Sequence, residues 1–381
     1  MTRHMLLAYG NPGALGDWRP LFALLAGYAA IVVALLVVGK RRKGFGPTYV
    51  LPRISEGLTR VTGLPGWAAA SVGTASFGLL VAGMGFYNDV AWHVRLGRDK
   101  TLFTAPHTAI VIGLFLIFAA AVVGTVMARL DEVDVGLRVR GFRVPWSMLA
   151  LGLLGGSALS GFPLDDLWHH FYGIDVTMWS PTHLLMILGA SFSPLACWLA
   201  LAEAGVRPRD GRWARGVYVA VAVMMLLGLS SAQGEFEFGV PQFQQLYHPV
   251  LIMLAAGIAL VATRFVLGRG WTFVVGGIAF LLATGNVIGG HTGSGVARSS
   301  AVYLGCAVAV ELGALLFGTE RPLRFAIASG VGLATLVSPA SGRGTRERSS
   351  AGRRRCFPMR SCSERSPPWL RASSAWPSAA R

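Results

Sequence analysis

Long apolar stretches make up most of this sequence, and short loops between them carry the polar and charged residues. A helix needs about 20 mostly apolar residues to cross the hydrocarbon core of a bilayer. The pattern therefore predicts an all-α, polytopic transmembrane helical bundle of about nine or ten spans. The predicted spans are 21–39, 67–87, 106–128, 145–162, 181–204, 215–232, 248–268, 271–289 and 299–318, with 323–338 as a tenth candidate.

Composition favours a membrane protein over a soluble one. Hydrophobic residues make up 53% of the chain and charged residues 14%, whereas about a quarter of a soluble protein is charged. The 49 glycines fit this interpretation because small residues let membrane helices approach closely. The lipid bilayer is therefore the first predicted partner.

The net charge of +16 indicates membrane topology rather than a nucleic-acid partner. Basic residues gather in alternate loops, which all lie on one side, and the positive-inside rule makes that side cytoplasmic. We therefore expect a multi-pass protein of the cell (inner or plasma) membrane with its N-terminus outside. The crowded loops hold Lys40, Arg41, Arg42, Lys43, Arg53, Arg60, Arg129, Arg138, Arg140, Arg143, Arg207, Arg209, Arg212, Arg215, Arg264, Arg269, Arg321 and Arg324.

Seven of the eight histidines map to outside loops or to the outer ends of spans, and the exception is His4. Glu235 and Glu237 share that side. Ionisable groups at membrane depth cost about 2.5–3.5 kcal/mol each on insertion scales and usually mark function. This distribution points to a chemical site at the outer face, although the roles of His248, His291 and Glu235 stay open.

Two polar segments of the chain match at a fixed interval. NDVAWHVRLGRDKTLFTAPH (88–107) and LDDLWHHFYGIDVTMWSPTH (164–183) are offset by 76 residues, and both contain the pattern D-x3-H-x5-D-x7-H. Because 76 residues hold two membrane crossings, the copies have the same orientation. The pattern predicts an internal parallel repeat, with copies around 67–128 and 145–204.

The chain outside the repeat has two parts. Residues 215–338 supply the extra spans and complete a transmembrane bundle over 1–338. Residues 339–381 carry ten arginines among serine, proline and glycine. Such a segment buries too little apolar surface to offset chain entropy, so we expect a basic, disordered tail.

The spacing within each copy predicts a helical hairpin. Asp89 and His93 are four residues apart, so on a helix they share a face. His107 lies 14 residues beyond His93, about 21 Å along a continuous helix, so the chain must turn before the two histidines can meet. Residues that end and start helices stand at the right places in both copies: Gly97, Thr104 and Pro106 in the first, and Gly173, Ser180 and Pro181 in the second.

The turn end of each hairpin would then bring one carboxylate and two imidazoles together. These three groups form a metal-ligand set. The predicted ligands are Asp89, His93 and His107 in one copy, and Asp165, His169 and His183 in the other. Imidazole suits copper, zinc, iron and nickel, so ligand type alone leaves the metal open. The alternative is a pair of satisfied polar loops, in which Asp99 and Asp175 cap the turns and the tryptophans anchor the membrane interface.

The first motif resembles the C subunit of copper membrane monooxygenases, the particulate methane and ammonia enzymes. The matching positions are Asp89, Trp92, His93, Arg98, Asp99, Phe103, Thr104 and His107. The resemblance implies a copper site at Asp89, His93 and His107, and copper rather than iron or zinc. It also implies a neighbouring site at the second copy, where Asp165 replaces the family's asparagine. The likeness covers residues 67–204, and the first motif has one extra residue before its second histidine.

Three functions follow from these observations. The first is a subunit of a copper-dependent membrane monooxygenase, an oxidoreductase that acts on a small apolar substrate together with partner subunits. The second is an extracytoplasmic copper-handling or transport protein without catalytic turnover. The third is an assembly factor that holds no stoichiometric metal. The sequence contains neither a hydrolytic triad nor a phosphate-binding glycine loop, which argues against hydrolase and nucleotide-driven functions.

Overall fold

The computed structural model describes residues 22–23, 26–31, 33–34, 47–96, 104–139, 142–173, 178–238, 247–288 and 294–353. The chain divides into two units, Met1–Ser338 and Pro339–Arg381, which are considered separately. Its elements are almost all helical: α2 (Pro47–Thr62), α3 (Gly66–Leu96), α4 (Ala105–Leu130), β1 (Leu137–Val139), β2 (Phe142–Val144), α5 (Trp146–Tyr172), α6 (Pro181–Glu203), α7 (Arg212–Ser230), the 3-10 turn η1 (Ser231–Gln233), α8 (Gly234–Phe238), α9 (Tyr247–Leu267), α10 (Trp271–Ile288), α11 (Ser294–Phe317) and α12 (Pro322–Arg353).

The predicted membrane bundle is confirmed in its class. Within the described residues, seven helical stretches are long and apolar enough to span a bilayer: Gly66–His93, Ala105–Leu130, Trp146–His169, Pro181–Glu203, Arg212–Phe238, Tyr247–Leu267 and Ser300–Phe317. Large apolar side chains such as Leu153 (75% exposed) and Phe77 (60% exposed) point outward, as a lipid solvent permits.

Among the described residues, these seven stretches match seven of the nine or ten predicted spans. The predicted spans 271–289 and 323–338 coincide with shorter apolar helical stretches, Trp271–Thr284 and Pro322–Val337. The predicted span 21–39 lies largely outside the described residues. Tyr28, which is described, donates a hydrogen bond to the Gly156 carbonyl oxygen at 2.9 Å.

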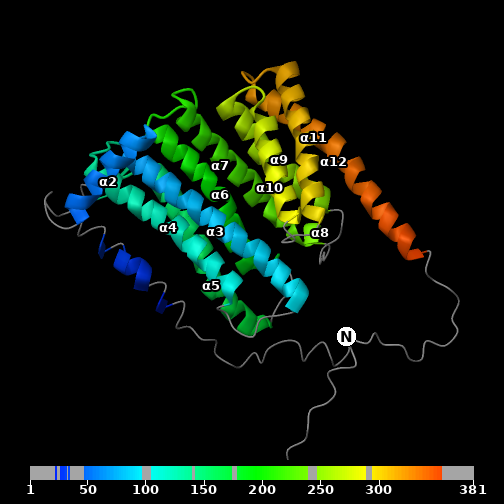
Figure 1. Cartoon of the computed structure of the whole chain (residues 1–381), viewed down its shortest axis with the longest axis horizontal. Coiled ribbons are helices and arrows are strands. Elements are labelled where there is room, and N and C mark those ends of the chain that lie inside the picture. Colours follow the sequence, from blue (N-terminus) through cyan, green and yellow to red (C-terminus); the bar gives the residue numbers. More distant parts are fainter. Residues whose placement is uncertain are drawn as a thin grey trace, which may run out of the picture. The chain divides into compact units, whose positions relative to one another are not determined.

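Helices α3 to α6 form two adjacent hairpins, with α3 packed along α4, α5 along α6, and α4 against α5 (Figure 1). Glycines allow this close packing. A Cβ atom added to Gly113 of α4 would lie 2.4 Å from the Ala82 nitrogen of α3. A Cβ atom added to Gly189 of α6 would lie 2.7 Å from the Leu154 carbonyl oxygen of α5. Any larger side chain at these two positions would force the helices apart.

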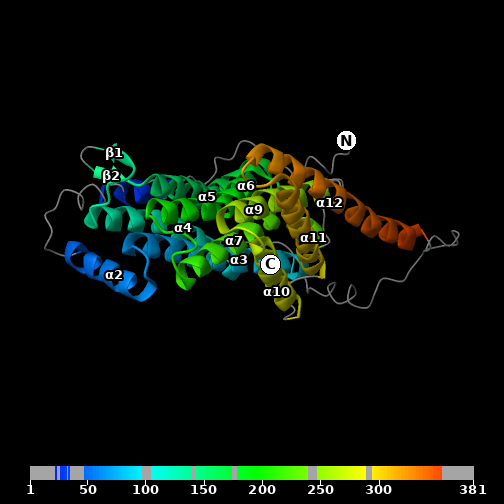
Figure 2. The same ribbon diagram turned by 90° about the horizontal axis from the view of Figure 1, so that it is seen from above.

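Two elements near the C-terminal end of α4 were not expected from the sequence. Helix α2 is amphipathic rather than apolar throughout, so it lacks the signature of a span. Its buried Ser55 donates a hydrogen bond to Asp131 Oδ2 at 2.7 Å, at the C-terminal end of α4. Strands β1 and β2 form an antiparallel hairpin in the α4–α5 connection. Figure 2 shows this hairpin at the same end of the bundle as α2.

Two carboxylates at this same end bind the starts of neighbouring helices. Glu203, at the end of α6, accepts hydrogen bonds from the backbone N–H of Ser147 at 3.0 Å and from its hydroxyl. Glu311 of α11 accepts from Thr272 at 2.7 Å and pairs with Arg264 at 3.0 Å. Glu203 thus satisfies a free backbone N–H group at the N-terminus of α5. Glu311 places its negative charge near the N-terminus of α10, where the helix dipole favours it.

Helix α12 extends past the predicted start of the tail at residue 339 and ends at Arg353. The predicted disorder of 339–381 stays a prediction. The rest of the predicted tail, 354–381, lies outside the described residues.

We predict that Gly113→Val destabilises the protein and that Gly83→Val does not. The valine at 113 would overlap the α3 backbone, and overpacking of this kind costs about 1–3 kcal/mol. Gly83 is the matched control because a Cβ atom there would meet nothing within 4 Å. Thermal unfolding in detergent, followed by circular dichroism, measures the difference. Equal melting temperatures for the two variants would contradict the close approach of α3 and α4.

Candidate metal centres

The first group of metal-ligating residues, here called the first triad, consists of Asp89, His93 and His107. Helix α3 continues as far as Leu96, so Asp89 and His93 lie one turn apart on the same helix. The predicted helix start after the turn is confirmed: Thr104 is the N-cap of α4, and its hydroxyl accepts from the backbone N–H of His107 at 3.5 Å. The chain therefore returns to place His107 opposite α3.

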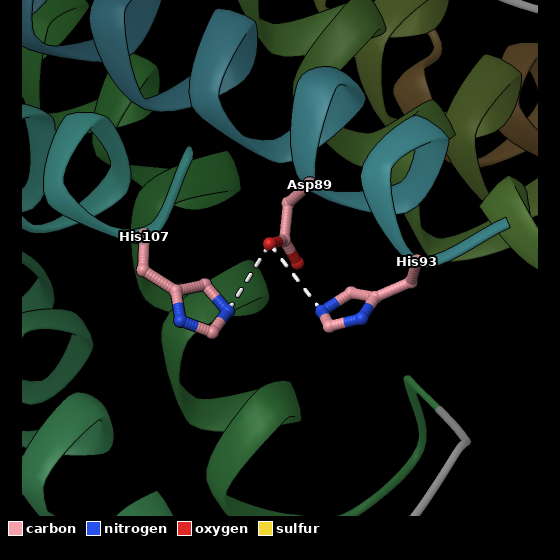
Figure 3. A group of neighbouring side chains, drawn as sticks. All are labelled: Asp89, His93 and His107. Atoms are coloured by element: carbon pink, nitrogen blue, oxygen red, sulfur yellow. Dashed lines mark ion pairs between the residues drawn. The ribbon is translucent and has the colours of Figure 1, made fainter. Parts of the chain in front are cut away.

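The three side chains of the first triad converge on one point (Figure 3). Oδ1 of Asp89 lies 3.1 Å from Nε2 of His107 and 3.5 Å from Nε2 of His93. The two imidazole centroids are 5.9 Å apart, with their planes inclined by 48°. The exposed fractions of these side chains are 17% for Asp89, 21% for His107 and 34% for His93.

The second triad consists of Asp165, His169 and His183 and is built in the same way. Helix α5 ends at Tyr172, and its C-cap Gly173 has φ of 83°, a left-handed conformation that glycine adopts without strain. Ser180 is the N-cap of α6, and its hydroxyl accepts from the His183 N–H at 3.4 Å. Asp165 Oδ2 lies 3.3 Å from His183 Nε2 and 3.7 Å from His169 Nε2.

Both triads have dimensions that suit a transition-metal ion. In each, one ligand atom from every residue lies within 4.8 Å of the other two. Nitrogen and oxygen ligands bind such ions at about 2.1 Å, so two ligands about 90–120° apart are separated by about 3.0–3.6 Å. The observed oxygen–nitrogen distances of 3.1–3.7 Å span this range closely. Each triad could therefore hold a metal ion.

The two triads differ in how their carboxylates are held. The hydroxyl of Thr182, in the first turn of α6, donates a hydrogen bond to Asp165 Oδ1. Asp165 is also more buried than Asp89, with 9% against 17% of the side chain exposed. Thr182 was not among the residues predicted from the sequence. When the two motifs are aligned at their 76-residue offset, Thr182 corresponds to Pro106, which has no hydroxyl, and this difference could have pointed to it.

The short helix α8 lies beside α3 and beside the turn that leads into α6. Gly234 of α8 lies against Phe86 of α3 and Met178, in the turn before α6. Glu235 is 3% exposed, and its Oε1 accepts a hydrogen bond from the Met178 N–H at 2.8 Å. The imidazole of His248 stacks on Phe236 with centroids 4.8 Å apart. These contacts connect α8 to the turn that leads into the second triad.

Several residues that the sequence singled out do not join either triad. Glu235, Glu237 and His248 are absent from the two groups of metal-ligating residues found within the described chain. Trp92 is 37% exposed, near the C-terminal end of α3. The remaining candidates lie outside the described residues: His4, Arg98, Asp99, Phe103, Asp175 and His291.

A groove of about 700 Å³ lies beside the first triad, between α3 and α4. Its walls are mostly apolar. Three of its residues immediately precede the ligands in sequence, namely Asn88, Trp92 and Pro106. The remaining lining residues are Val81, Met84, Gly85, Ala91, Ala105 and Ala109. A mostly apolar groove therefore lies near the first triad, although none of its three ligands lines the groove.

Comparison with protein-family models, with curated proteins and with solved structures finds no match for this chain. The resemblance to copper membrane monooxygenases therefore depends on the motif residues themselves.

We predict that each triad binds one transition-metal ion and that the two sites can be removed separately. Replacing His93 and His107 by alanine should remove about one equivalent, and replacing His169 and His183 should remove another, because two of three protein ligands are lost. Elemental analysis of protein purified in lipid nanodiscs measures both losses. His248→Ala is the control, since it deletes an imidazole outside the triads. If a double variant keeps the full metal content, the triad whose histidines were replaced is not a metal site.

Proposed function

We propose that this chain is a copper-binding integral membrane protein and a subunit of a copper-dependent membrane monooxygenase. One observation carries the proposal: two groups of one carboxylate and two imidazoles, each compact enough for a single ion, in a bundle of membrane-length helices. Placing ionisable side chains within membrane-spanning helices costs free energy, so such side chains usually serve a function.

Ligand chemistry supports copper as the metal. Among divalent first-row ions, copper(II) binds a given nitrogen and oxygen site most tightly. The resemblance of the first motif to the C subunit of copper membrane monooxygenases points the same way, with iron and zinc as less favoured candidates. Three protein ligands leave coordination positions for an external ligand. A bound copper ion would supply the redox chemistry for transferring one oxygen atom of dioxygen to a substrate.

The chain's own residues would hold and orient the ion beside the substrate. Asp89, His93 and His107 would bind it at the turn end of the α3–α4 hairpin. The apolar groove next to them supports a small apolar substrate. Electrons and the remaining catalytic groups would come from partner subunits, which form part of the proposal.

We also infer that the α3–α4 and α5–α6 hairpins are parallel copies of one unit. The helix contacts support this inference as well as the motifs. Gly113 approaches Gly78 and Ala82, and Gly189 approaches Leu154 and Ala158. Residues 113, 78 and 82 become 189, 154 and 158 when 76 is added, which is the offset of the polar motifs.

The basic loops support an orientation in the cell membrane. The α6–α7 connection carries Arg207, Arg209 and Arg212, and it lies at the opposite ends of these helices from His183 and Glu235. By the positive-inside rule this connection is cytoplasmic. The triads would then lie near the extracytoplasmic face, with the N-terminus on that side.

The second candidate is a protein that binds and delivers copper outside the cytoplasm without turnover. The partial exposure of the imidazoles favours it, because an ion that is handed on must be reachable. The exposed fraction of the four histidine side chains is between 21% and 34%.

We predict a type 2 copper(II) signal with nitrogen coupling in the electron paramagnetic resonance spectrum of the purified protein. The signal should disappear when both pairs of triad histidines are replaced, because the imidazole nitrogens are its source. Turnover is measured separately, as oxidation of a short-chain hydrocarbon by membranes that contain the protein and its partners. Copper binding without any turnover would support the second candidate, and protein that binds no copper would refute both.

A further inference from the structure

We propose that the second triad is a braced metal site in which Thr182 is the positioning residue, and that the first triad is the site where the ion exchanges. This inference deepens the proposed function and rests on the proposal that both triads bind copper. It concerns the groups that hold the ligands, which differ between the two hairpins.

The two oxygens of Asp165 have separate partners. Oδ1 accepts the hydrogen bond from the Thr182 hydroxyl, while Oδ2 faces the imidazole nitrogens of His169 and His183. The hydroxyl therefore restrains the rotation of the carboxylate and leaves Oδ2 facing the two imidazoles, where it would bind the ion. Hydrogen bonds of this kind to a ligating carboxylate typically contribute about 10–100-fold to metal affinity.

The turn that carries Thr182 is itself restrained. Ser180 Oγ lies 3.4 Å from Thr182 Oγ1, and both residues are buried. Two residues earlier, the Met178 N–H donates to the buried carboxylate of Glu235 at 2.8 Å. A polar contact shielded from water is stronger than the same contact in solvent, so this turn resists the movement that would release the ion.

Among the described residues, no hydroxyl donates to the carboxylate of the first triad as Thr182 does to that of the second. Within the part of the chain that the structure describes, the side-chain partners of the Asp89 carboxylate are His93 and His107. The position that corresponds to Thr182 is Pro106, which cannot donate a hydrogen bond. Asp89 is also the more exposed carboxylate of the two. Rotation of this side chain meets less resistance, so an ion here should enter and leave faster.

The test uses the full chain in lipid nanodiscs, loaded with copper(II). Alanine at His93 and His107 leaves only the second triad, and alanine at His169 and His183 leaves only the first. Copper affinity is measured by competition with a chelator, and release is followed by stopped flow after excess chelator is added. We expect slower release from the second triad than from the first, and the reverse order would overturn the proposal without any change at Thr182.

Substitutions at Thr182 then identify the brace. With only the second triad present, Thr182→Val should weaken copper affinity about 10–100-fold and alter the copper resonance spectrum. Thr182→Ser keeps the hydroxyl and should restore both. The matched control is Thr108→Val with only the first triad present, because the Thr108 hydroxyl donates to the Thr104 carbonyl oxygen at 2.7 Å rather than to Asp89.

The outcomes separate this inference from the proposed function. A folded Thr182→Val variant with unchanged affinity, release rate and spectrum would overturn the brace while leaving copper binding intact. Failure of both single-triad proteins to bind copper would instead refute the proposed function, and this inference with it. If Thr182→Val does not fold, the comparison of release rates between the two triads still decides the proposal.

Discussion

A carboxylate within an apolar helical bundle needs partners, since water is not there to solvate it, and this constraint organises both ends of the molecule. Burying an unpaired charge costs far more than the few kcal/mol that separate folded from unfolded protein. Asp89 and Asp165 satisfy the constraint with two imidazoles each. That arrangement leaves a carboxylate and two nitrogens facing a common point. The solution to a solvation problem is therefore also a ligand set for a metal ion.

At the opposite end the same constraint has a structural outcome. Glu203 accepts backbone and hydroxyl hydrogen bonds at the start of α5, and Glu311 binds Arg264 and Thr272 near the start of α10. These carboxylates meet N–H donors or a cation and leave no set of facing imidazoles. The chemical character of each end thus follows from the partner that the carboxylate finds. Acidic residues are a poor guide to function in this bundle until their partners are known.

The two hairpins share a backbone plan and differ in what surrounds the ligands. In both, close packing at a glycine of the second helix sets the distance between helices, and a capped helix start returns a histidine towards the preceding helix. The difference between Pro106 and Thr182 adds a hydrogen bond in only one of them. Two sites with the same ligands can in this way acquire different affinities and exchange rates.

The sequence by itself determined the helical membrane class, the hairpin turns and the six triad residues as candidates. Apolar length, the four-residue spacing of Asp89 and His93, and the capping residues are local properties that neighbouring residues set. Only the tertiary structure decided that Thr182 binds Asp165 and that Glu235 binds the Met178 N–H, across 17 and 57 residues. It also decided how α2 packs through Ser55. Such contacts depend on how whole helices pack against one another. The number of residues between two side chains does not specify whether that packing brings them together.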